Sequence, residues 1–176
     1  CVSSCMMTAL IGVSATDSTG RGTGLDSAGV SHKAQIIEQS LRRAELATGQ
    51  VMSEWSAQTL AEQVGGFEIL AMAGAMLQSA QRQTAFVVDG FICSVALLFA
   101  QKVVPNVREY AIFAHQSNEK AHKMLLSHLS AEPILSLDLR LGEGSGAILA
   151  YPLIKSACIF LKNMASFESA GVSDSK

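Results

Sequence analysis

The spacing of apolar residues predicts a chain of helices interrupted by two short runs of strand character. Apolar residues recur at helical spacing over residues 2–11, 30–47, 52–64, 67–81, 91–104, 119–129 and 145–169. The runs 84–88 and 110–114 are continuous, short and apolar, as expected for buried parallel strands. Because strands alternate with helices, we predict an α/β fold, a three-layer Rossmann-like arrangement with helices flanking a parallel sheet.

Two strands are too few for a sheet that is stable alone. The chain also begins at Cys1 inside an apolar, helix-like run, without an initiator methionine or a capping residue. Residues 14–29, by contrast, lack apolar periodicity and read as a loop. We therefore expect residues 1–176 to be the C-terminal portion of a single domain that has further strands upstream.

Composition argues against two function classes. The formal net charge of −2, with no basic run, argues against a nucleic-acid-binding protein. The apolar window 86–100 contains Asp89 and is shorter than the ~20 residues that cross a membrane. The four cysteines form no CxxC pair, and Cys93 and Cys158 lie in apolar helical patterns. This usage is typical of reduced core cysteines in a cytoplasmic protein.

Polar residues follow each predicted strand directly. Asp89 comes after residues 84–88, and His115 and Ser117 come after residues 110–114. The carboxyl ends of parallel strands share one edge of the sheet, where ligands of open α/β folds bind. We expect these side chains to converge there, and we assign His122 and His128 to the surface of the following helix.

The most informative stretch is residues 139–147. Three glycines in this stretch alternate with an acid and a serine, and an apolar helical run follows them. The five residues are Gly142, Glu143, Gly144, Ser145 and Gly146. The serine is placed to cap that helix, and the free amides of the first turn favour an anion. A carboxylate competes with such an anion, so we interpret Glu143 as a residue that handles a proton.

A second glycine-alternating segment, residues 20–26, has two readings. It is either a flexible connection or an anion-binding loop. Lys33, placed near the start of the following helix, is correspondingly either solvated or directed back to that anion. Glu68 opens the helix 67–81, where an acid stabilises the helix dipole.

The sequence has no phosphate-binding Walker motif, no metal-ligand triplet with the usual spacing and no nucleophile elbow. Glycine loops, one lysine and several carboxylates remain. This inventory fits phosphoribosyl transfer, in which amides and a lysine bind the phosphate and a carboxylate takes a proton from the nucleophile.

Several of these segments, in this order, resemble the nicotinate-nucleotide–dimethylbenzimidazole phosphoribosyltransferase family over essentially the whole chain. The segments that carry the resemblance are 20–26 (GRGTGLD), 64–69 (VGGFEI), 88–92 (VDGFI), 115–119 (HQSNE), 139–147 (LRLGEGSGA) and 164–172 (MASFESAGV).

The resemblance implies transfer of the 5-phosphoribosyl group from nicotinate mononucleotide to 5,6-dimethylbenzimidazole. The products are α-ribazole 5′-phosphate and nicotinate, in the assembly of the cobalamin lower ligand. It implies that Glu143 is the catalytic base, that Lys33 binds the phosphate, and that the enzyme is a cytoplasmic homodimer without metal or cofactor. The implied substrate-binding residues are Lys33, Gly22, Thr23, Gly24, Glu68, Asp89, Ser117, Leu141, Gly142, Gly144, Ser145 and Gly146.

The family's members are about twice this length, and part of their pocket for the aromatic base comes from the other half. One alternative therefore stays open, a truncated non-catalytic chain that binds a nucleotide or a partner polypeptide. Another is an unrelated α/β domain with glycine loops. Related enzymes also accept other benzimidazoles, purines or phenols, so the identity of the base is open.

Overall fold

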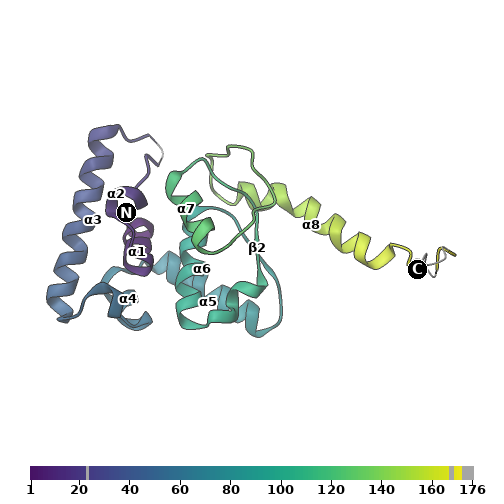
Figure 1. The fold of residues 1–176 in the computed structure, drawn as a ribbon, viewed down its shortest axis with the longest axis horizontal. Helices are drawn as coiled ribbons and strands as arrows, with labels where there is room; N and C mark the ends of the chain where they lie inside the picture. Colours follow the sequence, from purple (N-terminus) through teal and green to yellow (C-terminus); the bar gives the residue numbers. More distant parts are fainter. Residues whose placement is uncertain (23, 167–168, 172–176) are drawn as a thin grey trace, which may run out of the picture.

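The computed structural model describes residues 1–22, 24–166 and 169–171, which form helices around a small parallel sheet (Figure 1). In chain order the elements are α1 (Val2–Ile11), α2 (Ala15–Ser18), α3 (Ser27–Thr48), η1 (Met52–Glu54), α4 (Ala57–Val64), α5 (Phe67–Gln81), β1 (Phe86–Val88), α6 (Phe91–Val103), η2 (Pro105–Tyr110), β2 (Ala111–Phe113), α7 (Lys120–His128) and α8 (Ser145–Asn163).

Among the described residues, the sheet consists of β1 and β2, paired in parallel with Val88 opposite Phe113. The predicted α/β class and parallel pairing are confirmed, although both strands are shorter than predicted. An isolated parallel bridge between His115 and Leu135 continues the pairing beyond β2. This bridge places the segment that leads to the Gly-Glu-Gly turn beside the loop that follows β2.

Helix α6 forms the centre of the core. It packs against α1, α5 and α7, and its residues 94–100 are all buried. Because α6 is apolar on every side, it can occupy the layer between the sheet and the outer helices. Its first residue, Phe91, is separated from Asp89 only by the N-cap Gly90, so the core fixes the position of that carboxylate.

The predicted loop 14–29 contains more structure than expected. Ser14 caps the short helix α2, and α3 begins at Ser27 instead of residue 30. The Asp26 carboxylate accepts a hydrogen bond from the N–H of Gly29 at 2.8 Å, which satisfies a free amide of the first turn of α3. The sequence reading missed this start because Gly29 interrupts the apolar pattern.

Helix α8 extends away from the other elements (Figure 1). It ends at Asn163, six residues before the predicted end at residue 169. Only its first two turns are anchored, through buried Gly146 and Ala150, and Cys158, predicted to lie in the core, is exposed. By length and composition alone α8 could cross a membrane, with 11 % of its apolar window buried.

Candidate functional site

Four segments converge at the carboxyl edge of the sheet. Gly20 lies against the Glu119 side chain, because a Cβ atom at Gly20 would be 3.4 Å from its carboxyl carbon. Next to it, Lys120 Nζ contacts Asp17 Oδ1 at 2.7 Å. The N–H of Asn118 donates to the Leu139 carbonyl at 3.4 Å. The loop 115–119 therefore lies between the first glycine segment and the strand-like segment that leads to Glu143.

The Gly142-Glu143-Gly144 turn has an unusual backbone. All three residues are left-handed, with φ of 80°, 55° and 78°. Glycine adopts this conformation freely, whereas it is unfavourable for glutamate, and such strain is concentrated at functional sites. The Glu143 side chain is exposed at the mouth of α8, as is Leu141, which precedes the turn. The turn thus presents a carboxylate to solvent.

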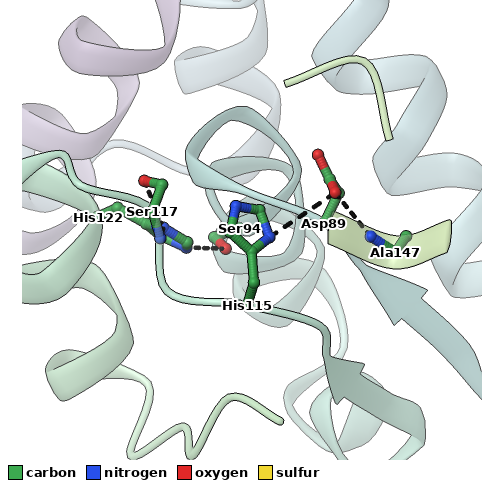
Figure 2. A network of polar contacts seen from close by, with 6 residues as sticks. All are labelled: Asp89, Ser94, His115, Ser117, His122 and Ala147. Carbon is green, nitrogen blue, oxygen red and sulfur yellow. Dashed lines mark hydrogen bonds and ion pairs between the residues drawn. The ribbon is translucent and has the colours of Figure 1, made fainter. Parts of the chain in front are cut away.

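Asp89 supplies the cap of α8. Its Oδ1 accepts a hydrogen bond from the N–H of Ala147 at 2.9 Å (Figure 2). The predicted cap, Ser145, makes no capping bond, because α8 begins at Ser145 and its N-cap is Gly144 in the left-handed conformation. The carboxylate that follows β1 therefore caps α8, the role predicted for Ser145.

His115 lies directly beneath the start of α8. It is 3 % exposed, and its Nδ1 is 3.8 Å from Asp89 Oδ1. A Cβ atom at Gly146 would overlap that same Nδ1. Only glycine fits at position 146, so the backbone of α8 rests on the imidazole ring.

His122, predicted to lie on the helix surface, is fully buried. Its Nδ1 accepts a hydrogen bond from the Ser117 N–H at 3.0 Å, and its Nε2 is 3.2 Å from Ser94 Oγ. Burial, and next the nearby His115, lower its pKa to about 4. The prediction was wrong because Ala121 and Leu125 mark the same face of α7 as apolar; His128 is exposed as predicted.

The remaining predicted residues show no hydrogen bond or ion pair to this cluster within the described part of the chain. Gly22 and Gly24 both have positive φ, while Thr23 lies outside the described residues. Lys33 and Glu68 lie near the α-amino group of Cys1, the N-cap of α1, because both affect the pKa of that group, which burial and then Lys33 lower. Neither takes part in the Lys120–Asp17 ion pair or in the 3.8 Å approach of His115 Nδ1 to Asp89 Oδ1, the two contacts of this kind within residues 1–22, 24–166 and 169–171.

Three buried polar atoms in the described part of the chain have no hydrogen-bond partner: Thr19 Oγ1, His115 Nδ1 and Ser145 Oγ. All three belong to the segments that converge at this edge. A buried polar atom without a partner costs about 1–3 kcal/mol, so its presence is typical of a site that receives a ligand or water. In the same part of the chain, no group of three His, Cys, Asp or Glu side chains could hold a metal.

A cavity of about 490 Å³ lies at the opposite ends of α6 and α7, lined among others by Lys102, Arg108 and His128. None of the predicted site residues lines it. Its basic side chains lie in the last turns of α6, η2 and α7, where positive charge complements the helix dipole.

Comparison with known proteins is consistent with this arrangement. A profile described as "Phosphoribosyltransferase" matches residues 1–172. The chain is 48 % identical over 168 residues to the nicotinate-nucleotide–dimethylbenzimidazole phosphoribosyltransferase of Vibrio vulnificus, covering 95 % of this chain and 46 % of the relative. The enzyme of the same name from Pseudomonas putida KT2440 is 52 % identical over 165 residues, covering 94 % and 45 %.

The crystal structure of CobT from Thermus thermophilus superposes with a TM-score of 0.88 at 35 % identity, covering 99 % of this chain and 50 % of that structure. The chain thus spans about half the length of the relatives that it matches. Since the family profile spans residues 1–172 and the Vibrio vulnificus and Pseudomonas putida relatives are 48 % and 52 % identical over 95 % and 94 % of the chain, this chain belongs to the nicotinate-nucleotide–dimethylbenzimidazole phosphoribosyltransferase family.

Proposed function

We propose that the chain takes part in transfer of the 5-phosphoribosyl group from nicotinate mononucleotide to 5,6-dimethylbenzimidazole or a related aromatic base. One observation carries the proposal: Glu143 is exposed in a left-handed conformation between two left-handed glycines, at the sheet edge where ligands bind. The names of the relatives supply the substrates. Residues 1–176 would then be the C-terminal portion of the catalytic domain.

The proposed chemistry needs one base. The free ring nitrogen of the benzimidazole attacks C1′, and the bond from C1′ to the pyridine nitrogen breaks with its electron pair on nicotinate. Glu143 takes the proton from the other ring nitrogen, so the product ring is neutral. A carboxylate in this role contributes about 10²–10⁴-fold to the rate.

The phosphate would be bound on the same edge. Its proposed ligands are amides and side chains of the two glycine segments and the loop between them, namely Gly22, Thr23, Gly24, Lys33, Ser117, Gly142, Gly144, Ser145 and Gly146. The Ser145 hydroxyl supports this assignment, because it is buried without a partner beside the first turn of α8. Leu141 and Glu68 are the other proposed substrate contacts, whereas the Asp89 carboxylate, for which the resemblance implies substrate contact, is already engaged by the N–H of Ala147.

The test is Glu143→Gln in this chain, with Asp138→Asn as matched control. Asp138 is another exposed acid with positive φ, 51°, in the same segment. We expect Glu143→Gln to lower kcat by about 10²–10⁴-fold, with binding of nicotinate mononucleotide unchanged, and Asp138→Asn to change neither. Normal turnover in Glu143→Gln would exclude Glu143 as the base.

A second candidate function is that of a non-catalytic subunit, and the exposed apolar side chains along α8 favour it. A non-catalytic subunit would bind nicotinate mononucleotide or a partner polypeptide without turnover. Calorimetry with nicotinate mononucleotide, combined with assay of nicotinate release, separates the two. Binding without release favours the subunit.

We also propose a cytoplasmic homodimer. The support is the apolar surface of α8, which is too extensive to be typical of a free monomer. The net charge of −2 does not favour nucleic acid as the partner of this surface. A second copy of the chain, with its own apolar α8, would cover it, and sedimentation equilibrium of the chain tests this.

A further inference from the structure

The start of α8 is held by two residues that are remote in sequence. Asp89 follows β1 and His115 follows β2, and both lie against residues 146–147 (Figure 2). Glu143 precedes these residues by one turn, and the Ser145 N–H donates to the Gly142 carbonyl at 3.0 Å. The turn and the helix start are therefore one connected unit.

The Asp89 carboxylate is committed to this unit. It is 8 % exposed, and its Oδ1 accepts from the Ala147 N–H at 2.9 Å. That N–H belongs to the third residue of α8, which has no acceptor within the helix. A buried carboxylate that accepts from a helix N-terminus is a strong and directional contact, because the helix dipole adds to the hydrogen bond.

His115 provides the second support, by shape. The imidazole fills the space that a side chain at position 146 would need, so α8 can approach only through Gly146. His115 is itself held from behind by His122, with ring centroids 6.0 Å apart in an edge-to-face arrangement. His122 is fixed in turn by Ser117 and Ser94. The contact between His115 and Gly146 is therefore supported by buried residues of the core.

We propose that Asp89 and His115 are positioning residues for Glu143: Asp89 by capping α8 at Ala147, and His115 by seating Gly146. This proposal rests on the proposed function in one respect, the role of Glu143 as the base. It assigns the strand-end aspartate a role distinct from substrate contact. A shift of the turn by about 1 Å is enough to lower the rate by about 10²-fold.

The first test is amide hydrogen exchange of the chain without substrate. Asp89→Ala removes the acceptor, and we expect exchange at Ala147 to become roughly 2- to 30-fold faster, the range expected for loss of a helix cap. Asp89→Asn keeps an acceptor oxygen and should stay close to the parent. Protection of residues 95–100 in α6 reports whether each variant is folded. Unchanged exchange at Ala147 in folded Asp89→Ala would overturn the capping role.

The second test uses the fit of Gly146. Gly146→Ala should lower the thermal midpoint, because the new methyl group meets the imidazole. Adding His115→Ala removes the ring. The double variant Gly146→Ala/His115→Ala should therefore recover at least half of the decrease in thermal midpoint. Gly74→Ala in α5 is the matched control, since a Cβ atom at Gly74 has no neighbour within 4 Å. If Gly146→Ala behaves like Gly74→Ala, the seating role is wrong.

The third test separates positioning from substrate contact. Positioning predicts that Asp89→Ala lowers kcat by about 10²-fold while the Kd of nicotinate mononucleotide changes by less than about 3-fold. A raised Kd with unchanged Ala147 exchange would overturn the proposal in favour of direct substrate contact. If the parent chain neither binds nor turns over substrate, the proposed function fails, and exchange at Ala147 still decides whether Asp89 caps α8.

Discussion

The N–H of Ser117 donates to Nδ1 of His122 at 3.0 Å, and the Ser117 hydroxyl lies 2.9 Å from the same nitrogen. A nitrogen that accepts an N–H carries no proton, so the network assigns the hydrogen of the neutral ring to Nε2, which faces Ser94 Oγ. The imidazole thereby joins the loop after β2 to the N-terminal part of α6. This loop adjoins both glycine segments, so the link shapes the proposed site.

The first prediction concerns stability at low pH. Burial lowers the pKa of His122 from 6.5 to about 4, so between these values the unfolded chain binds a proton that the folded chain does not. The contribution of neutral His122 to the free energy of unfolding is then fully present above pH 6.5. It is lost as the pH falls toward 4, a loss on the order of 3 kcal/mol. Urea unfolding at a series of pH values measures this slope.

His122→Gln should flatten the slope between pH 4 and 6.5, because glutamine does not titrate. The matched control is His128→Gln, since His128 is exposed at the end of the same helix, and this variant should retain the slope of the parent. Equal slopes in the parent and in His122→Gln would show that His122 does not carry the pH dependence.

The sequence predicted those parts of the fold that depend on local pattern. The two short apolar runs became a parallel pair, and the acids and glycines that follow strands collected at one edge. His122 was misassigned although the pattern contained the signal, because an apolar face of α7 passes through residues 121, 122 and 125. A polar residue on an apolar helix face can be buried when its hydrogen-bond partners lie on other elements, as Ser94 and Ser117 do for His122.

The cap of α8 could not be predicted in the same way. Asp89 and Ala147 are 58 residues apart, and a local reading favoured Ser145, which has the right residue type and position. Only the folded structure shows that Asp89, which follows β1, accepts the hydrogen bond from the Ala147 N–H. The exposure of α8 could not be predicted either. An apolar composition shows that a helix can be buried, but it does not show whether another element covers the helix.

The second prediction tests the strain in the Gly-Glu-Gly turn. Alanine normally stabilises a position relative to glycine, but at φ of 55° the order reverses, because a Cβ atom disfavours the left-handed conformation. We expect Glu143→Gly to be more stable than Glu143→Ala by about 1 kcal/mol in chemical denaturation.

A matched pair at an ordinary helical position completes this experiment. Gln35 is exposed in the interior of α3, and there Gln35→Ala should be more stable than Gln35→Gly by about 1 kcal/mol. The same order at both positions would contradict a left-handed Glu143.

The third prediction concerns Arg108, which closes the C-terminal end of α7. Its Nε donates to the Leu129 carbonyl at 2.6 Å and a terminal nitrogen donates to the Ser130 carbonyl. The guanidinium also lies over the Phe113 ring, 5.8 Å from its centroid. Lysine cannot make this forked contact, so Arg108→Lys should lower the free energy of unfolding by about 1–3 kcal/mol.

The control for Arg108→Lys is the same substitution at Arg43, which is exposed on α3 and should be neutral within about 0.5 kcal/mol. Thermal unfolding of the two variants under identical conditions compares them directly. A loss of stability at Arg43 as large as that at Arg108 would point to a general effect of the substitution instead of the α7 contact.

The last prediction addresses the uncovered surface of α8. Phe160, Leu161 and Met164 are 67 %, 87 % and 74 % exposed near its end, which is the exposure of an interface before its partner binds. If α8 forms the proposed homodimer, Leu161→Glu should shift the chain from dimer to monomer in sedimentation equilibrium, because a buried unpaired charge is strongly unfavourable.

Ser156→Glu is the matched control for this prediction. It adds the same charge on the same helix at an exposed polar position, and we expect it to leave the dimer intact. A parent chain that is monomeric at all concentrations would contradict the homodimer. Co-sedimentation of that monomer with phosphatidylcholine vesicles, lost in Leu161→Glu, would instead assign the apolar surface of α8 to a membrane, for which its length and composition are sufficient.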